Sequence, residues 1–141
     1  MSNQILEKSQ ELKDYLVKVR HHLHQNPELG MEEVETTSFI KQELTAMGIE
    51  IAQLNVKVGV LGILKGEKPG PNFVTALRAD IDALPIHEQT GVPWASRRSG
   101  VMHACGHDGH TTILLGAAKL LSRMCSQFSG TVKFIFQPGE E

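Results

Sequence analysis

The sequence has little of what marks nucleic-acid-binding or membrane proteins. Its 141 residues carry 14 Lys and Arg against 16 Asp and Glu, so no basic excess favours a nucleic-acid partner. The polar stretch 1–14 contains no apolar run like that of a signal peptide. No apolar run elsewhere approaches the length of a membrane span. We therefore expect neither a nucleic-acid partner nor a membrane partner.

Cysteine is also scarce, since the chain contains only Cys105 and Cys125. These two residues could pair in principle, but so low a count suits a reducing compartment, and we predict a cytoplasmic protein. Cys125 is then expected to be a small buried helix residue. A closed, cysteine-rich structural zinc site is excluded by the count.

What the sequence does have is the composition of an ordinary globular domain, with 40% apolar and 21% charged residues. Its length is enough for one domain with a core of its own. The spacing of apolar residues predicts helices at about 4–25, 31–47 and 109–125. Short strands are predicted at 49–54, 58–64, 73–78 and 131–136. This alternation predicts an α/β sandwich around a mostly parallel sheet.

The stretch 101–110 gathers most of the reactive side chains. It contains one thiol, three imidazoles and one carboxylate, which are the ligand types of zinc and its first-row neighbours. The predicted helix that follows would place them near a helix N-terminus, where backbone N–H groups favour anionic ligands. A metal site is one interpretation. A thiol nucleophile, with Cys105 activated by His103 or His107, is the other.

Carboxylates follow two of the predicted strands. Asp80 and Asp82 come after the third strand, and Glu140 and Glu141 come after the fourth. Ligands of open α/β sheets bind outside the carboxyl ends of the strands, so these groups are candidates for the same site. One glutamate could bind a metal while the other accepts a proton from water. The alternative for this pair is a solvated, charged chain end.

Two further segments remain open from the residues alone. The run 20–24, Arg-His-His-Leu-His, is either a second ligand cluster or a set of helix-end histidines favoured by the helix dipole. The irregular stretch 83–100 is long for a loop inside a compact domain, and such loops are usually functional or disordered.

Four motifs occur in an order that resembles a known family. They are residues 20–30, residues 78–85, the run 102–111 with Cys-Gly-His-Asp-Gly-His, and the final 136–141 with its Glu-Glu pair. Together they resemble the metal-dependent amidohydrolases and metallopeptidases that include hippurate hydrolase, N-acyl-amino-acid amidohydrolases, bacterial carboxypeptidases and plant auxin-conjugate hydrolases. The resemblance runs from about Val17 to the last residue.

The resemblance implies a three-layer α/β sandwich with helices on a mostly parallel or mixed sheet, and a site with two divalent metal ions. Manganese or zinc is implied, with cobalt and nickel as alternatives. Cys105, His107 and Glu141 match metal ligands of the family, and Glu140 matches its general base. Asp82 matches an aspartate that supports the site.

Asp80 stands where the wider clan has a histidine ligand, which leaves its role open. The implied reaction is hydrolysis of the amide bond in a small N-acyl amino acid, by a family that commonly forms homodimers. Residues 1–141 match only the N-terminal portion of the catalytic domain, without the lid or dimerisation domain and the C-terminal catalytic portion. We therefore expect the chain by itself to be inactive. A non-catalytic metal-binding or partner-binding remnant, or a thiol hydrolase using Cys105, remains an alternative.

Overall fold

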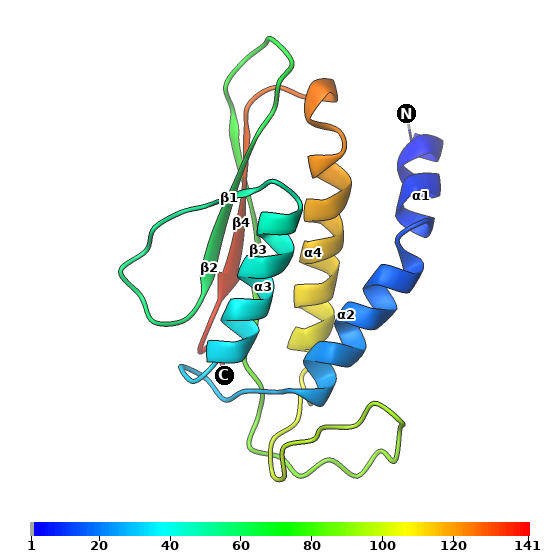
Figure 1. Cartoon of the computed structure of the whole chain (residues 1–141), viewed down its shortest axis with the longest axis vertical. Helices are drawn as coiled ribbons and strands as arrows, with labels where there is room; N and C mark the ends of the chain where they lie inside the picture. Colours follow the sequence, from blue (N-terminus) through cyan, green and yellow to red (C-terminus); the bar gives the residue numbers. More distant parts are fainter. Residues whose placement is uncertain (1) are drawn as a thin grey trace.

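A computed structural model describes residues 2–141 (Figure 1). The helices and strands follow one another in the order predicted from the apolar pattern. Their bounds are α1 Ser2–Gln10, α2 Lys13–Gln25, α3 Val34–Ala46, β1 Glu50–Ile51, β2 Val60–Lys65, β3 Val74–Asp80, α4 His107–Ser122, the short 3-10 helix η1 Cys125–Gln127 and β4 Thr131–Gln137.

The four strands form one mixed sheet in the order β1-β2-β4-β3. β3 and β4 are parallel and in register from Val74 opposite Thr131 to Asp80 opposite Gln137. β2 runs antiparallel to β4, and β1 runs antiparallel to β2. The α/β class and the mixed sheet are confirmed, whereas the mostly parallel alternative is not, because only one of the three strand pairings is parallel.

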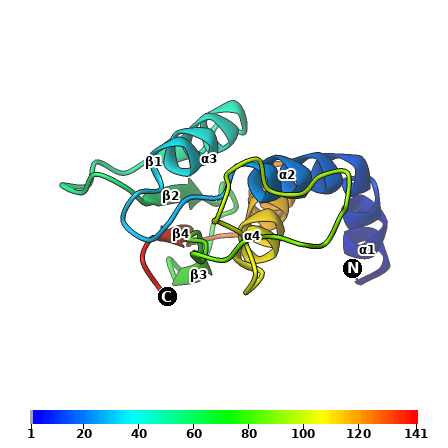
Figure 2. The same ribbon diagram turned by 90° about the horizontal axis from the view of Figure 1, so that it is seen from below.

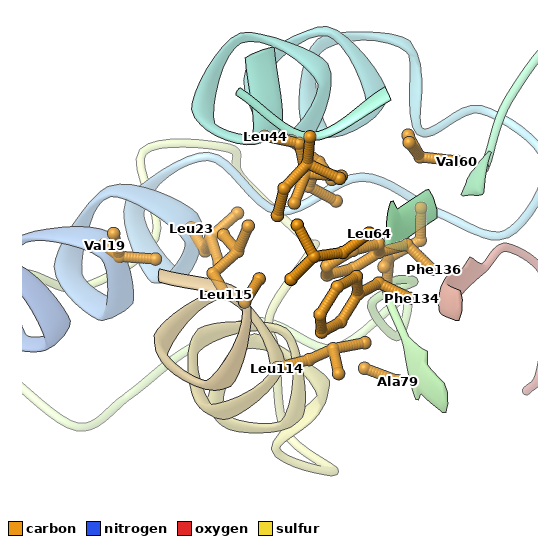
Figure 3. Close-up of a cluster of buried hydrophobic side chains, with 14 residues drawn as sticks. Val19, Leu23, Leu44, Val60, Leu64, Ala79, Leu114, Leu115, Phe134 and Phe136 are labelled. Carbon is orange, nitrogen blue, oxygen red and sulfur yellow. The ribbon is translucent and has the colours of Figure 1, made fainter. Parts of the chain in front are cut away.

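α3 and α4 pack on one face of this sheet, and α1 and α2 pack against α4 (Figure 2). Alternate residues of β4, Phe134 and Phe136, point into this layer and are almost completely buried. Leu44 of α3 and Leu115 of α4 meet them in the same apolar cluster (Figure 3). On the other face, alternate residues of β2 and β4 are only half-buried. Residues 2–141 thus form two layers of the predicted sandwich.

The first predicted helix is divided into α1 and α2. At the division the Leu12 amide bonds to the Ser9 carbonyl, three residues back, instead of four. The change of direction buries Leu12, while Ile5, which shares its predicted apolar stripe, stays 43% exposed. A single helix over 4–25 was therefore wrong at this one point, because a local pattern does not show where a helix bends to follow its neighbours (Figure 1).

Two other bounds differ from expectation in ways that matter for the site. α4 begins at His107, so this residue lies in the first turn of the helix and not in the preceding loop. Cys125 lies in η1 and is only half-buried, with a free thiol. Within the described residues, every helix is too short or too polar to cross a bilayer.

Candidate metal centre

The parallel pairing of β3 and β4 brings two pairs of carboxylates to one end of the sheet. The Ile81 amide donates to the Gln137 carbonyl at 3.0 Å and extends the pairing beyond the strands. Asp82, which follows, is buried, and its Oδ2 accepts hydrogen bonds from the amides of Glu140 at 2.7 Å and Glu141 at 2.9 Å. This carboxylate therefore turns the end of the chain back over the sheet edge.

His107 faces these carboxylates from the start of α4. Its Nδ1 lies 3.0 Å from Asp82 Oδ1, and because a carboxylate only accepts, Nδ1 carries the proton. Nε2 is then free to bind a metal, and it points at Glu140 Oε2, 3.7 Å away, and Glu141 Oε1, 3.8 Å away. The preceding Gly106 has φ of 101°, a left-handed conformation that lets the loop enter the helix at this angle.

Three of the predicted site residues converge on one point. The Cys105 thiol, a ring nitrogen of His107 and a carboxylate oxygen of Glu141 all lie within 4.8 Å of one another. A hydrogen bond to Glu141 and the charge of that carboxylate raise the pKa of the Cys105 thiol. A sulfur, a nitrogen and an oxygen donor at this spacing fit a zinc-like divalent ion, which would offset the negative charge gathered here.

Asp80, whose role the sequence left open, belongs to a second group with His107 and His110. Asp80 Oδ1 lies 2.6 Å from His110 Nδ1, and its Oδ2 lies 3.9 Å from His107 Nε2. Burial acts to raise the pKa of the Asp80 carboxyl, but the hydrogen bond with His110 and the two nearby imidazoles hold it below its usual value. The two groups share His107, so they are neighbouring halves of one site.

Among the described residues, His103 belongs to neither group of donors. It is buried, and within residues 2–141 neither of its ring nitrogens has a hydrogen-bond partner. Burial lowers the pKa of His103 to about 4, which keeps the ring neutral. The partner of the Cys105 thiol is the Glu141 carboxylate, which raises the thiol's pKa and thus opposes activation. This arrangement does not favour the thiol nucleophile.

Glu33 was not foreseen as a site residue, because the sequence placed it only within the predicted helix 31–47. It is completely buried, and its Oε1 accepts a hydrogen bond from the Gly139 amide at 2.9 Å. Burial raises the pKa of this carboxyl. A Cβ on Gly30 would lie 3.2 Å from the Gly139 Cα, so the segment before α3 supports the turn that leads into Glu140. The motif over residues 20–30, which ends three residues before Glu33, was the available signal that this segment belongs to the site.

Comparisons with known proteins agree with this geometry. Residues 76–141 match the model of peptidase family M20/M25/M40. The chain is 53% identical over 130 residues to N-acetyl-L-cysteine deacetylase of Bacillus subtilis, covering 92% of this chain and 31% of that protein. It is 48% identical over 124 residues to hippurate hydrolase of Campylobacter jejuni, covering 88% of this chain and 31% of the relative.

A solved structure extends the similarity to the fold. A dinuclear metal-binding peptidase of the M20 family from Bacillus subtilis matches with a TM-score of 0.87 and 48% identity, over 93% of this chain and 36% of that one. The chain thus spans about a third of the length of the relatives it matches. In its motifs and its fold the chain is similar to proteins of peptidase family M20/M25/M40 and to the metal-dependent amidohydrolases that its sequence resembles.

Proposed function

We propose that these residues are the N-terminal portion of a metal-dependent hydrolase of amide bonds in N-acyl amino acids or related small peptide-like conjugates. One observation carries the proposal: the thiol of Cys105, the imidazole of His107 and the carboxylate of Glu141 lie within 4.8 Å of one another at the end of the sheet. A deacetylase of N-acetyl-L-cysteine and a hippurate hydrolase among the relatives support this substrate class.

Cys105, His107 and Glu141 are proposed as the metal ligands. A divalent ion held there would polarise the amide carbonyl and lower the pKa of a water molecule. Asp82 would fix the tautomer of His107 through Nδ1, which leaves Nε2 as the donor. The dinuclear centre of the Bacillus subtilis relative supports two ions, and the donor set suits manganese or zinc, with cobalt or nickel as alternatives.

Glu140 is proposed as the general base. Its side chain is 42% exposed, and Oε2 lies 3.7 Å from His107 Nε2, so the carboxylate borders the metal position and remains open to water. Asp82 holds the Glu140 amide at 2.7 Å and thereby directs the side chain. A carboxylate so placed can accept a proton at Oε2 from the attacking water and pass it to the leaving amine.

We propose that the 141 residues by themselves do not turn over substrate. Within residues 2–141, three candidate ligands meet at the point shared by Cys105, His107 and Glu141, and the second group of donors reuses His107. A dinuclear site needs more donors than these residues supply. A cytoplasmic location and a homodimer of the longer protein are parts of the same proposal.

Metal binding by the purified chain tests the ligand assignment. Equilibrium dialysis against manganese or zinc should show that Glu141→Gln and Cys105→Ser each weaken binding at least about tenfold, because each removes a ligand. Glu140→Gln should retain nearly the full affinity. The assignment is overturned if Glu140→Gln loses metal while Glu141→Gln keeps it.

Hydrolysis tests the remaining roles. The chain should release no glycine from hippurate with or without metal. In a longer protein that carries these residues, Glu140→Gln should abolish turnover while metal stays bound, since an amide accepts no proton at neutral pH. Metal-independent turnover that Cys105→Ser removes would replace this proposal with the thiol hydrolase.

A further inference from the structure

The Arg-His-His-Leu-His run at the end of α2 has no part in the proposed metal chemistry, yet its polar side chains all have specific contacts. The His21 ring stacks on Trp94 with centroids 4.2 Å apart. His22 packs on the Phe39 ring at 4.3 Å. Arg20 and His24, one helical turn apart, both face Asp108 in the first turn of α4. The run therefore joins α2 to the 83–100 loop, to α3 and to α4.

His24 lies between two carboxylates from distant segments. Its Nδ1 is 2.6 Å from Asp108 Oδ2, and its Nε2 is 3.1 Å from Glu88 Oε1. Carboxylate oxygens only accept hydrogen bonds, so the ring meets an acceptor at each of its two nitrogens. His24 is buried, so it joins the two carboxylates in a place with little water.

Glu88 is the anchor of the 83–100 loop, which Figures 1 and 2 show below the ends of α2 and α4. The Glu88 carboxylate accepts hydrogen bonds from the Ser96 amide and the Thr90 hydroxyl as well as from His24. Burial acts to raise the pKa of Glu88, but these hydrogen bonds hold it below its usual value. The Arg97 amide also bonds to the Gln25 carbonyl at 3.0 Å. The loop is thus closed on itself and attached to α2.

Asp108 is the other anchor, and it directly follows His107 in sequence. Its side chain is fully buried, with Oδ2 also 2.8 Å from Arg20 Nε and Oδ1 accepting the Gly109 amide at 2.8 Å. These contacts fix the rotation of the first turn of α4, and with it the direction of the neighbouring His107 side chain. A chain of contacts therefore runs from Glu88 through His24 and Asp108 to the metal cluster.

We propose that His24 is a positioning residue for the metal centre. Its ring, held between Glu88 and Asp108, locks the 83–100 loop and the first turn of α4 against α2 and so directs His107 Nε2 toward Cys105 and Glu141. The inference rests on the proposed metal-binding function. The loop leads directly into the 101–106 segment that carries Cys105. The clamp, which is the His24 ring between Glu88 and Asp108, therefore acts on two of the proposed ligands.

Cobalt binding by the 141-residue chain tests the effect on the site, because a cobalt–thiolate absorption band reports on the bond to Cys105. His24→Gln keeps N–H donors on one nitrogen only, so it cannot reach the two carboxylates that meet opposite nitrogens of the His24 ring. It should raise the cobalt dissociation constant about 10- to 100-fold, as loss of a residue that orients a ligand typically does, and weaken the thiolate band. His22→Gln is the matched control from the same run, because His22 packs on Phe39 and has no hydrogen bond or ion pair with a carboxylate of the described residues. This variant should bind cobalt normally.

Glu88→Gln separates positioning from simple folding, because it leaves α2 and the contact with Asp108 in place. Glu88→Gln should weaken cobalt binding by itself. In the double variant with His24→Gln, the loss of cobalt-binding free energy should be smaller than the sum of the two single losses, since both residues act through one contact. The proposal is overturned if His24→Gln binds cobalt with the wild-type affinity and spectrum, if His22→Gln weakens it equally, or if the two effects simply add.

Hydrogen exchange of the metal-free chain keeps this inference separate from the metal proposal. His24→Gln should speed exchange of the Ser96 and Arg97 amides at least about tenfold and leave the Phe134 amide in β4 unchanged. If wild-type chain binds no cobalt but this exchange pattern is found, the proposed metal site fails and the clamp stands as a structural one. Unchanged exchange at Ser96 and Arg97 refutes the clamp, whatever metal binds.

Discussion

Asp82 Oδ2 accepts a hydrogen bond from the Glu141 amide at 2.9 Å, although 59 residues separate the two in sequence. The other oxygen of the same carboxylate faces His107 Nδ1 at 3.0 Å. One buried side chain therefore positions the main chain of one proposed ligand and the ring of another. Asp82, two residues beyond the end of β3, therefore supports the centre from two sides.

We expect Asp82→Asn to destabilise the chain by about 1–3 kcal/mol. The new NH₂ group must face either the Nδ1–H of His107 or the amides of Glu140 and Glu141. All of these are donors, so one hydrogen bond is replaced by two donors facing each other. Urea unfolding measures this. Glu35→Gln is the control, since it removes only a surface pair with Arg98 and should cost less than about 1 kcal/mol. Equal losses in the two variants would contradict this role for Asp82.

Glu141→Gln should accelerate alkylation of Cys105 by iodoacetamide in metal-free chain at pH 7.5. The Glu141 carboxylate holds the pKa of the thiol above its usual value, and below a thiol's pKa the thiolate fraction rises about tenfold for each unit by which that pKa falls. We expect a several-fold increase, followed by mass spectrometry. Cys125 is the internal control, because burial raises its pKa and Glu141 is not among the causes.

His103 should make the chain less stable in mild acid. Its pKa is about 4 in the folded state and 6.5 in the unfolded state, so only the unfolded chain takes up this proton as the pH falls below 6.5. The stability present above that pH is lost progressively toward pH 4, by up to about 3 kcal/mol. His103→Leu removes two ring nitrogens that have no hydrogen-bond partner among the described residues. The free energy of unfolding should then depend less on pH between pH 6.5 and pH 4. The prediction is wrong if urea unfolding shows that the wild type and His103→Leu lose the same free energy of unfolding between pH 7 and pH 4.5.

Truncating a core side chain of α4 should destabilise the chain more than truncating a surface side chain of the same helix. Leu115 of α4 is completely buried against β4, so Leu115→Ala should cost about 2–5 kcal/mol. Ile113 is 69% exposed, and Ile113→Ala should cost less than about 1 kcal/mol. Thermal unfolding of the two variants side by side checks the orientation of α4, and a reversed order would show that the helix is turned differently.

Local pattern was sufficient wherever the determining interactions are local. The 3.6-residue period predicted the helices, and short apolar runs predicted the strands, because each element buries one face. The convergence of the site was also foreseeable, since Asp80, Asp82, Glu140 and Glu141 follow strands that turned out to be parallel neighbours, which end at the same edge. The roles proposed for these residues stay predictions.

The contacts that hold the site depend on the tertiary structure. The sequence alone did not show that Glu33 supports Gly139, that His110 pairs with Asp80, or that His24 bridges Glu88 and Asp108. Each of these pairs joins segments separated by 30 or more residues, and each gives a buried polar group a partner that packing brings to it.

The sequence by itself determined the element types, the α/β class and the cluster of thiol, imidazole and carboxylate donors, because these follow from periodicity and from residue chemistry within a short stretch. Only the tertiary structure decided the strand order β1-β2-β4-β3, the bend at Leu12 and the partner of each buried polar side chain. Those choices arise from packing between segments far apart in the chain, where strand neighbours and buried hydrogen bonds are selected together, and no local pattern records that selection.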